Sequence, residues 1–339
     1  MTGDLALVTG GAGFIGRHLV GLLARSGRQV RVLDVQDRPE DFGAEVDYIR
    51  GSILDREAVE AATAGAAEVY HTAANAHLWA RDKDDFERIN VTGTHTVLDA
   101  AARHSPRRVV VTATEVILRG WRDASTRPLT EDEPTPPLDD MPGPYARSKH
   151  RADQLARRAA ADGVPVVIVY PTVPVGAGDW GLTAPTRMIR DFAGGRTPAY
   201  LDCLLNLVPV ADVAAGHVLA AERGQVGERV LLGGQDVRLG RMLAMLARLT
   251  GRAMPRRRVP YWLAHTAGLV SEAIADHMSH RPPAAPLEGV RLARHDWPVD
   301  SGRARQRLGY APGPVEPALK QAVDWLDQAG LMSANGHEL

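Results

Sequence analysis

The chain has 339 residues, of which 45% are hydrophobic and 24% are charged, as in an ordinary globular protein. Its 40 basic and 41 acidic residues nearly cancel, which excludes a broad electrostatic field for nucleic acid, an anionic membrane or an acidic polymer. The single cysteine, Cys203, excludes an internal disulfide, and without a signal-peptide pattern or an apolar run of about 18 residues we expect a cytoplasmic protein with no transmembrane segment.

Short apolar runs alternate with helix-like segments along the first half of the chain. The predicted strands are residues 5–9, 30–34, 46–50, 68–73, 107–114 and 164–171. Helices are predicted after the first strand, at about residues 83–104 and near residues 145–161. Apolar strands that are separated by helices predict βαβ units and a parallel sheet buried on both faces.

After Pro171 this pattern loosens. Two more strands are predicted at residues 205–210 and 229–234, and residues 238–330 are mostly helical. The expected fold is therefore α/β, a Rossmann-type doubly wound parallel sheet with a smaller, mostly helical C-terminal part. We expect a dinucleotide-binding domain at 1–171, to which the later strands near 205–234 return, and a discontinuous substrate-binding domain at 172–330.

A glycine-rich turn, VTGGAGFIG, lies where the first strand meets the first helix. Gly10 suits a tight turn, Gly13 the close approach of a pyrophosphate, and Gly16 the packing of the helix on the strand. The alternative is a turn that serves chain geometry alone. Asp34 ends the second strand, where a carboxylate accepts hydrogen bonds from ribose hydroxyls and repels a 2′-phosphate, so we expect NAD rather than NADP. A capping role for Asp34 is the alternative, and the nearby Arg38 weakens the preference for NAD.

Lys149 is one of only three lysines among the 40 basic residues, and it follows Tyr145 by four positions. On a helix the two share a face, where the ammonium would lower the pKa of the phenol and bind ribose hydroxyls. Such a phenol exchanges a proton with a carbinol or carbonyl oxygen while a nicotinamide exchanges hydride at the adjacent carbon. A surface tyrosine beside a solvated lysine is the alternative. Thr112 and Thr114 each offer a hydroxyl to the substrate oxygen, or are ordinary strand threonines.

Taken together, TGGAGFIG, Asp34, HTAA (71–74), NVTGT (90–94), TAT and YARSK resemble the extended short-chain dehydrogenase/reductase superfamily. The resemblance covers nearly the whole chain and implies an NAD-dependent enzyme, active as a homodimer through the helices at 83–104 and 145–161. It implies catalytic roles for Tyr145, Lys149 and Thr114, the last in place of the usual serine. The cofactor contacts that it implies are Gly10, Gly13, Phe14, Ile15, Gly16, Asp34, Ser52, Ile53, Ala73, Thr112, Tyr145, Lys149 and Pro171. Asn90 is either the superfamily's structural asparagine near the proton path or a turn residue.

Within the superfamily, parts of the chain look like 3β-hydroxysteroid dehydrogenases, and others like hopanoid-associated sugar epimerases and their dihydroflavonol-reductase-like relatives. Nucleotide-sugar enzymes of the superfamily carry an asparagine and an Arg-Asp pair that grip the diphosphate, where this chain has Pro174 and Leu205-Asn206. Loss of the guanidinium forfeits about 1.5–3 kcal/mol of charge-assisted bonding, which argues against a nucleotide sugar. Ser52 and Ile53 replace the usual Asp-Leu pair at the adenine.

The leading hypothesis is an NAD-dependent oxidoreductase that interconverts a secondary alcohol and a ketone on a fairly apolar small molecule such as a sterol, triterpenoid or polyketide. The alternatives are an NAD-dependent sugar epimerase and a non-catalytic NAD-binding sensor. Glu115 stands where sugar dehydratases carry an acid, but Val116 replaces their second acid, so Glu115 is a structural residue or a modest site candidate. We expect no metal site at His277 and His280. Residues 260–278 predict an amphipathic helix that packs over the cleft, forms an apolar lid or touches a membrane surface.

Overall fold

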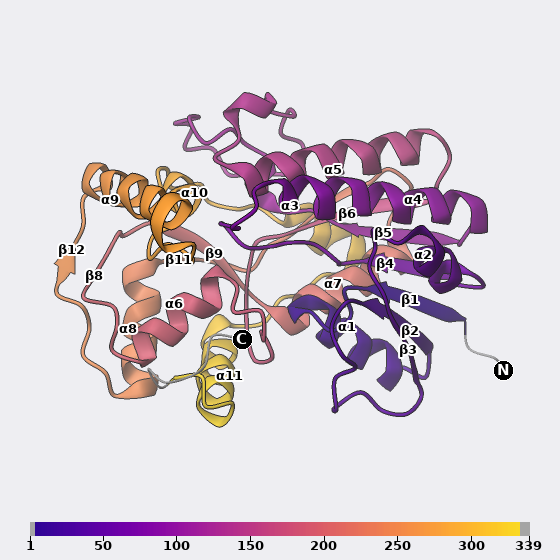
Figure 1. The fold of residues 1–339 in the computed structure, drawn as a ribbon, viewed down its shortest axis with the longest axis horizontal. Coiled ribbons are helices and arrows are strands. Elements are labelled where there is room, and N and C mark those ends of the chain that lie inside the picture. The colour runs from indigo at the N-terminus through magenta and orange to yellow at the C-terminus, as the bar shows by residue number, and fades with distance from the viewer. Residues whose placement is uncertain (1–3, 333–339) are drawn as a thin grey trace.

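A seven-stranded parallel sheet forms the centre of the computed structural model, which describes residues 4–332 (Figure 1). The strand order is β10-β6-β5-β4-β1-β2-β3, and every neighbouring pair is parallel. The strands are β1 (Leu5–Thr9), β2 (Gln29–Asp34), β3 (Val46–Arg50), β4 (Glu68–His71), β5 (Arg108–Thr112), β6 (Val166–Pro171) and β10 (Arg229–Leu232). The predicted doubly wound α/β fold is therefore confirmed.

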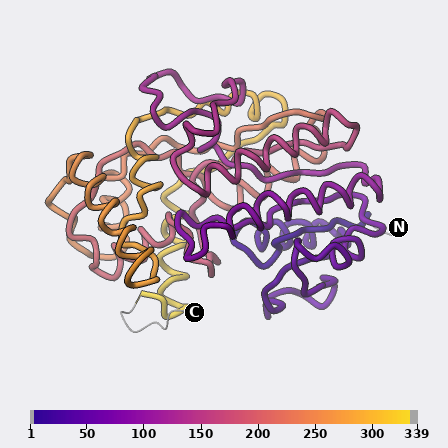
Figure 2. The backbone as a smooth tube through the Cα atoms, turned by 45° about the horizontal axis from the view of Figure 1, so that its top comes forward, coloured from indigo at the N-terminus to yellow at the C-terminus, as the bar shows by residue number. Residues whose placement is uncertain are grey.

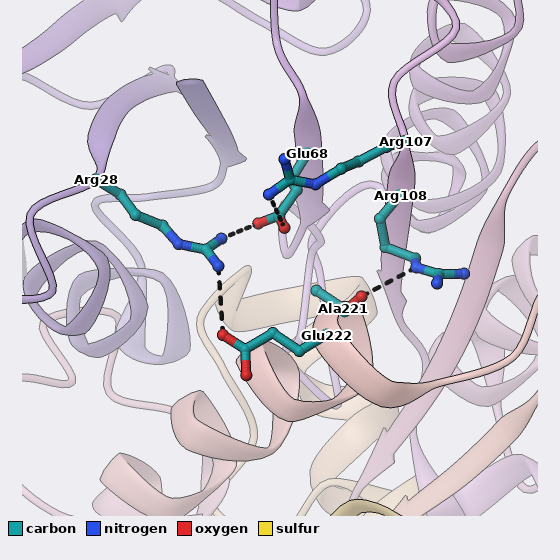
Figure 3. Close-up of a pocket in the computed structure, with 6 residues that line it drawn as sticks. All are labelled: Arg28, Glu68, Arg107, Arg108, Ala221 and Glu222. Atoms are coloured by element: carbon teal, nitrogen blue, oxygen red, sulfur yellow. Dashed lines mark hydrogen bonds and ion pairs between the residues drawn. The ribbon is translucent and has the colours of Figure 1, made fainter. Parts of the chain in front are cut away.

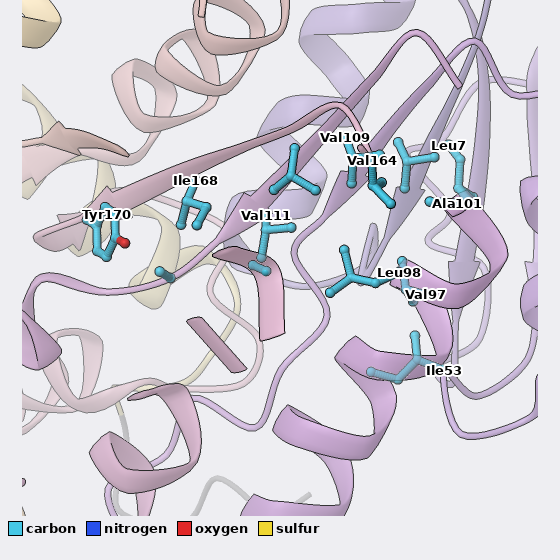
Figure 4. Close-up of a cluster of buried hydrophobic side chains, with 14 of the residues drawn as sticks. Leu7, Ile53, Val97, Leu98, Ala101, Val109, Val111, Val164, Ile168 and Tyr170 are labelled. Atoms are coloured by element: carbon cyan, nitrogen blue, oxygen red, sulfur yellow. The ribbon is translucent and has the colours of Figure 1, made fainter. Parts of the chain in front are cut away.

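Helices cover both faces of this sheet (Figure 1). One face carries α2 (Arg56–Thr63), α4 (Gly93–His104) and α5 (Pro144–Ala161), and the other carries α1 (Phe14–Arg25) and α7 (Val210–Arg223). Side chains alternate between the two cores, because successive strand residues point to opposite faces. Val109 and Val111 pack on the side of α4, in the cluster of Figure 4, whereas Val110 packs on the side of α1 and α7.

The predicted helix at 83–104 is not a continuous α-helix. It consists of α3 (Asp84–Phe86), a π-helical segment η1 (Glu87–Thr92) and α4. Extra residues in a turn change the direction of the side chains, and such segments are common at functional sites. Asn90 lies in η1 and is buried.

The C-terminal half adds a second core beside the carboxyl ends of the parallel strands; in Figures 1 and 2 it lies on the side away from the N-terminus. It contains a three-stranded sheet of β7 (Val173–Val175), β9 (Leu204–Pro209) and β11 (Gln235–Arg238), and a two-stranded sheet of β8 (Ala199–Tyr200) and β12 (Arg257–Arg258). Its helices are α6 (Ala184–Ala193), α8 (Leu239–Thr250), α9 (Tyr261–Ile274) with the π-helical η4 (Ala275–Ser279), α10 (Leu287–Leu292) and α11 (Val315–Gln328). Short turns of helix complete the chain at η2 (Glu115–Ile117), η3 (Leu138–Asp140) and η5 (Ala304–Leu308).

One strand lies elsewhere than the sequence predicts. Of the two strands expected to return to the large sheet, β10 pairs with β6, but β9 lies in the three-stranded sheet. The reason is that β7 and β11 occupy both edges of β9 and leave it no free edge for another partner.

Candidate active site

The glycine turn between β1 and α1 leaves room for a phosphate group. Gly10 has φ +73°, and a Cβ there would lie 2.6 Å from the Cα of Ala73. A Cβ on Gly16 would lie 2.1 Å from the carbonyl oxygen of Gly10, so helix and strand approach closely only because this residue is glycine. A Cβ on Gly13 would meet only the Gly10 oxygen, at 3.2 Å. This open side, at the N-terminus of α1, fits the pyrophosphate of a dinucleotide.

Asp34 supports the turn from the end of β2. Its carboxylate accepts the backbone N–H of Ala12 at 2.9 Å and that of Gln36 at 3.0 Å. From the sequence, Arg38 is a residue that weakens the preference for NAD. Its guanidinium donates to three backbone carbonyls within residues 42–46. The Asp34 carboxylate therefore lies at the end of β2, where the sequence predicts a ribose contact, while the Arg38 guanidinium is bonded to backbone carbonyls.

The other predicted cofactor residues also lie at the carboxyl edge of the sheet. The Ser52 hydroxyl accepts the N–H of Leu54 at 3.1 Å, and Ile53 is packed so tightly on α4 that a Cβ on Gly93 would lie 2.3 Å from it. Phe14 and Ile15 form the first turn of α1, Ala73 follows β4, and Pro171 ends β6.

Tyr145 and Lys149 lie in the first two turns of α5, where Lys149 is buried and Tyr145 is partly buried. The Lys149 ammonium donates to the carbonyl oxygen of Thr112 at 2.6 Å, and its burial lowers the pKa of Lys149 to about 8. The Tyr145 ring lies edge-on to Phe86 with 6.5 Å between centroids. The sequence predicts that Lys149 lowers the pKa of Tyr145, but burial raises it, and a hydrogen bond with Thr114 opposes that rise only in part. Desolvation of the phenolate outweighs the electrostatic effect that the spacing predicts.

The two candidate threonines are used differently. The Nδ1 of His217 donates to the carbonyl of Val213 at 2.7 Å, so its Nε2 accepts the hydroxyl proton of Thr112 at 2.9 Å. Burial lowers the pKa of His217 to about 4, which agrees with this neutral form. Thr112 therefore reaches the site through its carbonyl and Lys149, whereas the hydroxyl of Thr114 is the one beside Tyr145.

Glu115 extends this group of side chains. Its carboxylate accepts the Thr114 hydroxyl at 3.0 Å, and burial raises its pKa to about 7. Tyr145, Thr114 and Glu115 therefore form one hydrogen-bonded series in which a carboxyl group titrates near neutral pH.

Asn90 joins two segments beneath Tyr145. Its amide donates to the hydroxyl of Ser148 at 2.9 Å and to the carbonyl of Asn75 at 3.1 Å, and its oxygen accepts the Asn75 N–H at 2.7 Å. Ser148 in turn donates to the carbonyl of Tyr145 at 2.8 Å. The π-helical turn thus brings Asn90 into contact with α5.

Glu288 is a residue of this site that the sequence analysis missed. It lies on α10, is buried, and accepts the backbone N–H groups of Tyr145 at 3.1 Å and Ala146 at 2.8 Å. It thereby caps the N-terminus of α5, whose own N-cap residue, Gly143, has no side chain to do so. No sequence pattern marks this role, because the carboxylate lies more than 140 positions from the helix that it caps.

In the C-terminal half, the side chain of Asn206 on β9 is hydrogen-bonded to its own neighbours. Its side-chain oxygen accepts from the Thr172 hydroxyl at 2.9 Å and the Gly234 N–H at 2.7 Å, and its amide donates to Asp236 at 2.7 Å. The pair that replaces Arg-Asp is therefore an uncharged Leu205 and a buried Asn206 whose side-chain oxygen and amide both bond to protein groups.

A surface depression of about 290 Å³ lies at the opposite, amino edge of the sheet (Figure 3). Its charges pair with one another: Glu68 with Arg28 and with Arg107, the latter at 2.8 Å, and Arg28 with Glu222 at 3.3 Å. These groups are far from the ends of the strands that carry Asp34 and Thr114, so we assign the depression no part in the chemistry.

Comparison with known proteins identifies the family. Residues 6–233 match the model of the NAD dependent epimerase/dehydratase family. The chain belongs to this family. The predicted superfamily, the assignment as an enzyme and the NAD cofactor are thereby confirmed, and the named relatives support an oxidoreductase role.

The chain is similar to three known proteins over almost its full length. The chain is 34% identical over 333 residues to a putative dihydroflavonol 4-reductase of Synechocystis sp., covering 96% of each chain. It is 33% identical to 4-hydroxy-2-methyl-3-oxo-4-farnesyl-3,4-dihydroquinoline-1-oxide ketoreductase of Stigmatella aurantiaca, covering 95% of this chain and 96% of the relative. The crystal structure of gox2253 is 32% identical and superposes with a TM-score of 0.81, covering 97% of this chain and 100% of that one.

Proposed function

We propose that this family member interconverts a secondary alcohol and a ketone on a fairly apolar small molecule, with NAD as hydride carrier. The observation that carries the substrate class is Leu205, an uncharged side chain where nucleotide-sugar enzymes of the superfamily hold a diphosphate with arginine, beside Asn206, whose amide is bonded to protein groups. The two named relatives support it, because the substrates in their names, a dihydroflavonol and a farnesylated quinoline oxide, are small molecules without a nucleotide. In this proposal residues 1–171 bind NAD and residues 172–330 bind the substrate; the homodimer and the cytoplasmic location stay predictions.

The proposed cofactor residues are the turn at Gly10, Gly13 and Gly16 for the pyrophosphate, Asp34 for the adenosine ribose, and Lys149 for the nicotinamide ribose. Bound NAD supplies the acceptor or donor of a hydride at its nicotinamide ring. Lys149 is suited to its part because its ammonium, already aimed by the Thr112 carbonyl, has two further N–H donors.

Tyr145 is the proposed acid and base. In reduction its phenol donates a proton to the carbonyl oxygen, and in oxidation its phenolate removes the proton of the alcohol. Since burial raises the pKa of Tyr145, the neutral phenol is the resting form, and proton removal becomes favourable only with cationic groups and hydroxyl donors around the oxygen. Thr114 would supply such a donor when its hydroxyl turns from the Glu115 carboxylate to the substrate oxygen beside the phenol.

Reduction of NAD by secondary alcohols of sterol, triterpenoid and polyketide type tests the proposal. We expect turnover in the unmodified enzyme and none in Tyr145→Phe, which keeps the ring against Phe86 and should still bind NAD. Tyr48→Phe, a substitution of a tyrosine hydroxyl bonded only to loop carbonyls, is the control. A fully active Tyr145→Phe enzyme would remove the mechanism, and tightly held NAD without net turnover would favour the sugar epimerase instead.

A further inference from the structure

The segment formed by α9 and η4 carries an exposed apolar face. Six of the nine large hydrophobic side chains exposed in the described chain lie on it, with Trp262 at 68% and Met278 at 76%. The six are Trp262, Leu263, Leu269, Val270, Ile274 and Met278. Their spacing places them on one side of the helix, and the other exposed residues between them are Thr266, Ala267, Ala273 and His277, none of which is a carboxylate. Scattered exposed hydrophobic residues are normal, but a contiguous face of this kind marks an interaction site.

The opposite side of the segment is fixed to the protein. Gly268 is buried against α10, where a Cβ would already lie within 3.5 Å of Leu287. Both acidic residues of the segment point inward: Glu272 accepts the Leu287 N–H at 2.9 Å, and Asp276 accepts from Trp79 at 2.7 Å. The apolar face is therefore held outward and has no carboxylate on it.

The charge around this face differs from that of the whole chain. Residues 252–281 contain five arginines and two acidic residues, a net charge of +3, whereas the whole chain has −1. Arg256 and Arg257 are exposed just before α9, and Arg281 is exposed just after η4. No carboxylate of the described residues pairs with any of these three side chains. In Figure 1, β12, which consists of Arg257 and Arg258, lies at the same end of the molecule as α9.

We propose that α9 and η4 dock on an anionic lipid surface, with the six apolar side chains in the outer acyl region and the arginines at the headgroups. A helix that buries one apolar face at a bilayer interface and carries cations at its flanks binds by these two contributions. A second copy of the chain fits less well, because a two-fold contact through this face would bring two segments of charge +3 together. The near-neutral charge of the whole chain argues against a broad attraction to an anionic membrane. The proposed contact depends instead on the local positive charge of residues 252–281.

Co-sedimentation with lipid vesicles tests the proposal without any turnover, so its outcome is separate from that of the proposed chemistry. We expect binding to vesicles of equimolar phosphatidylcholine and phosphatidylglycerol, weaker binding as salt is raised, and little binding to pure phosphatidylcholine. Val270→Asp combined with Ile274→Asp should abolish it. Reversal of two charges, Arg256→Glu with Arg257→Glu, should weaken it by about tenfold or more.

Val226→Asp is the matched control, because Val226 is 52% exposed and Val270 55%, yet Val226 lies outside the segment. Both aspartate variants replace exposed side chains, so their thermal unfolding should match that of the unmodified protein. Equal binding to neutral and anionic vesicles, or full binding by the Val270→Asp/Ile274→Asp variant, would overturn the proposal. So would a dimer in light scattering that the same variant splits, because the face would then belong to a second copy.

Discussion

The carboxylate of Glu288 accepts the backbone N–H of Ala146 at 2.8 Å, although 142 residues separate the two in the chain. The same carboxylate accepts the N–H of Tyr145 at 3.1 Å. The first turn of α5 is thus held by a carboxylate of α10 in the C-terminal half. The position of the Tyr145 backbone therefore depends on contact between the two halves.

Glu288→Gln should lower kcat by about tenfold or more, because one acceptor of the pair becomes an N–H donor and the first turn of α5 shifts. The KM for NAD should change little, since the glycine turn is untouched. Steady-state kinetics check this against Glu272→Gln, which alters a similar carboxylate-to-backbone bond within the α9–α10 pair. Equal losses in the two variants would contradict a specific role for Glu288.

The same residue should give stability a pH dependence. Burial raises the pKa of Glu288 to about 7, from the 4.5 expected in the unfolded chain. Between these values the folded state keeps a proton that the unfolded state has lost, so the free energy of unfolding falls as pH rises. The Glu288→Gln variant should lack this pH dependence. Between pH 5 and pH 8 its free energy of unfolding should therefore rise by up to about 3 kcal/mol relative to that of the unmodified protein, as measured by denaturant unfolding. Parallel pH curves for the two proteins would refute it.

Cofactor choice should follow Asp34. We expect a clearly lower KM for NAD(H) than for NADP(H), because a 2′-phosphate would meet the carboxylate while Arg38 is bonded to the chain. Asp34→Asn should reduce the ratio of the KM for NADP(H) to the KM for NAD(H) by about tenfold, because the negative charge is lost but a hydrogen-bond acceptor remains. Asp37→Asn, which alters only an exposed ion pair with Arg50, should leave it unchanged. Comparable or better kinetics with NADP(H) in the unmodified enzyme would defeat this prediction.

The two threonines should separate activity from stability. Thr114→Val should lower kcat by about 10²-fold, as for the loss of one donor to a reacting oxygen, while Thr114→Ser should stay close to the unmodified enzyme. Thr112→Val should mainly cost stability, about 1–3 kcal/mol, because it leaves His217 without its hydroxyl donor. Steady-state kinetics and thermal unfolding of the three variants check this prediction. A large loss of kcat in Thr112→Val with little loss in Thr114→Val would instead assign the catalytic hydroxyl to Thr112.

Replacement of glycine by alanine in α1 should damage the nucleotide turn at Gly16, where helix and strand approach closely, but not at Gly21. In Gly16→Ala the new Cβ would lie 2.1 Å from the Gly10 oxygen, so we expect lost NAD affinity and lower stability. In Gly21→Ala, on the same helix, it would meet only the flexible Arg25 side chain at 3.1 Å, and a gain of up to about 1 kcal/mol is expected. Fluorescence titration with NADH checks both, and unaltered affinity in Gly16→Ala would count against the turn as the phosphate site.

Local patterns predicted most of the large sheet. Its strands are continuous apolar runs bounded by turn residues, and burial on both faces makes such runs recognisable without tertiary information. The sequence prediction placed β9 in the large sheet, but β9 lies in the three-stranded sheet. An apolar run predicts a strand but does not indicate which other strand it will pair with. The π-helical turn at Asn90 was also hidden, because α- and π-helical segments share the same composition.

The sequence by itself determined the parallel sheet, the glycine turn, Asp34 and the Tyr145–Lys149 pair, because each depends on residues close together along the chain. Only the tertiary structure decided which threonine stands beside the phenol, that burial raises the pKa of Tyr145, and that Glu288 caps its helix. These depend on desolvation and on contacts between segments far apart in sequence, which no spacing along the chain encodes.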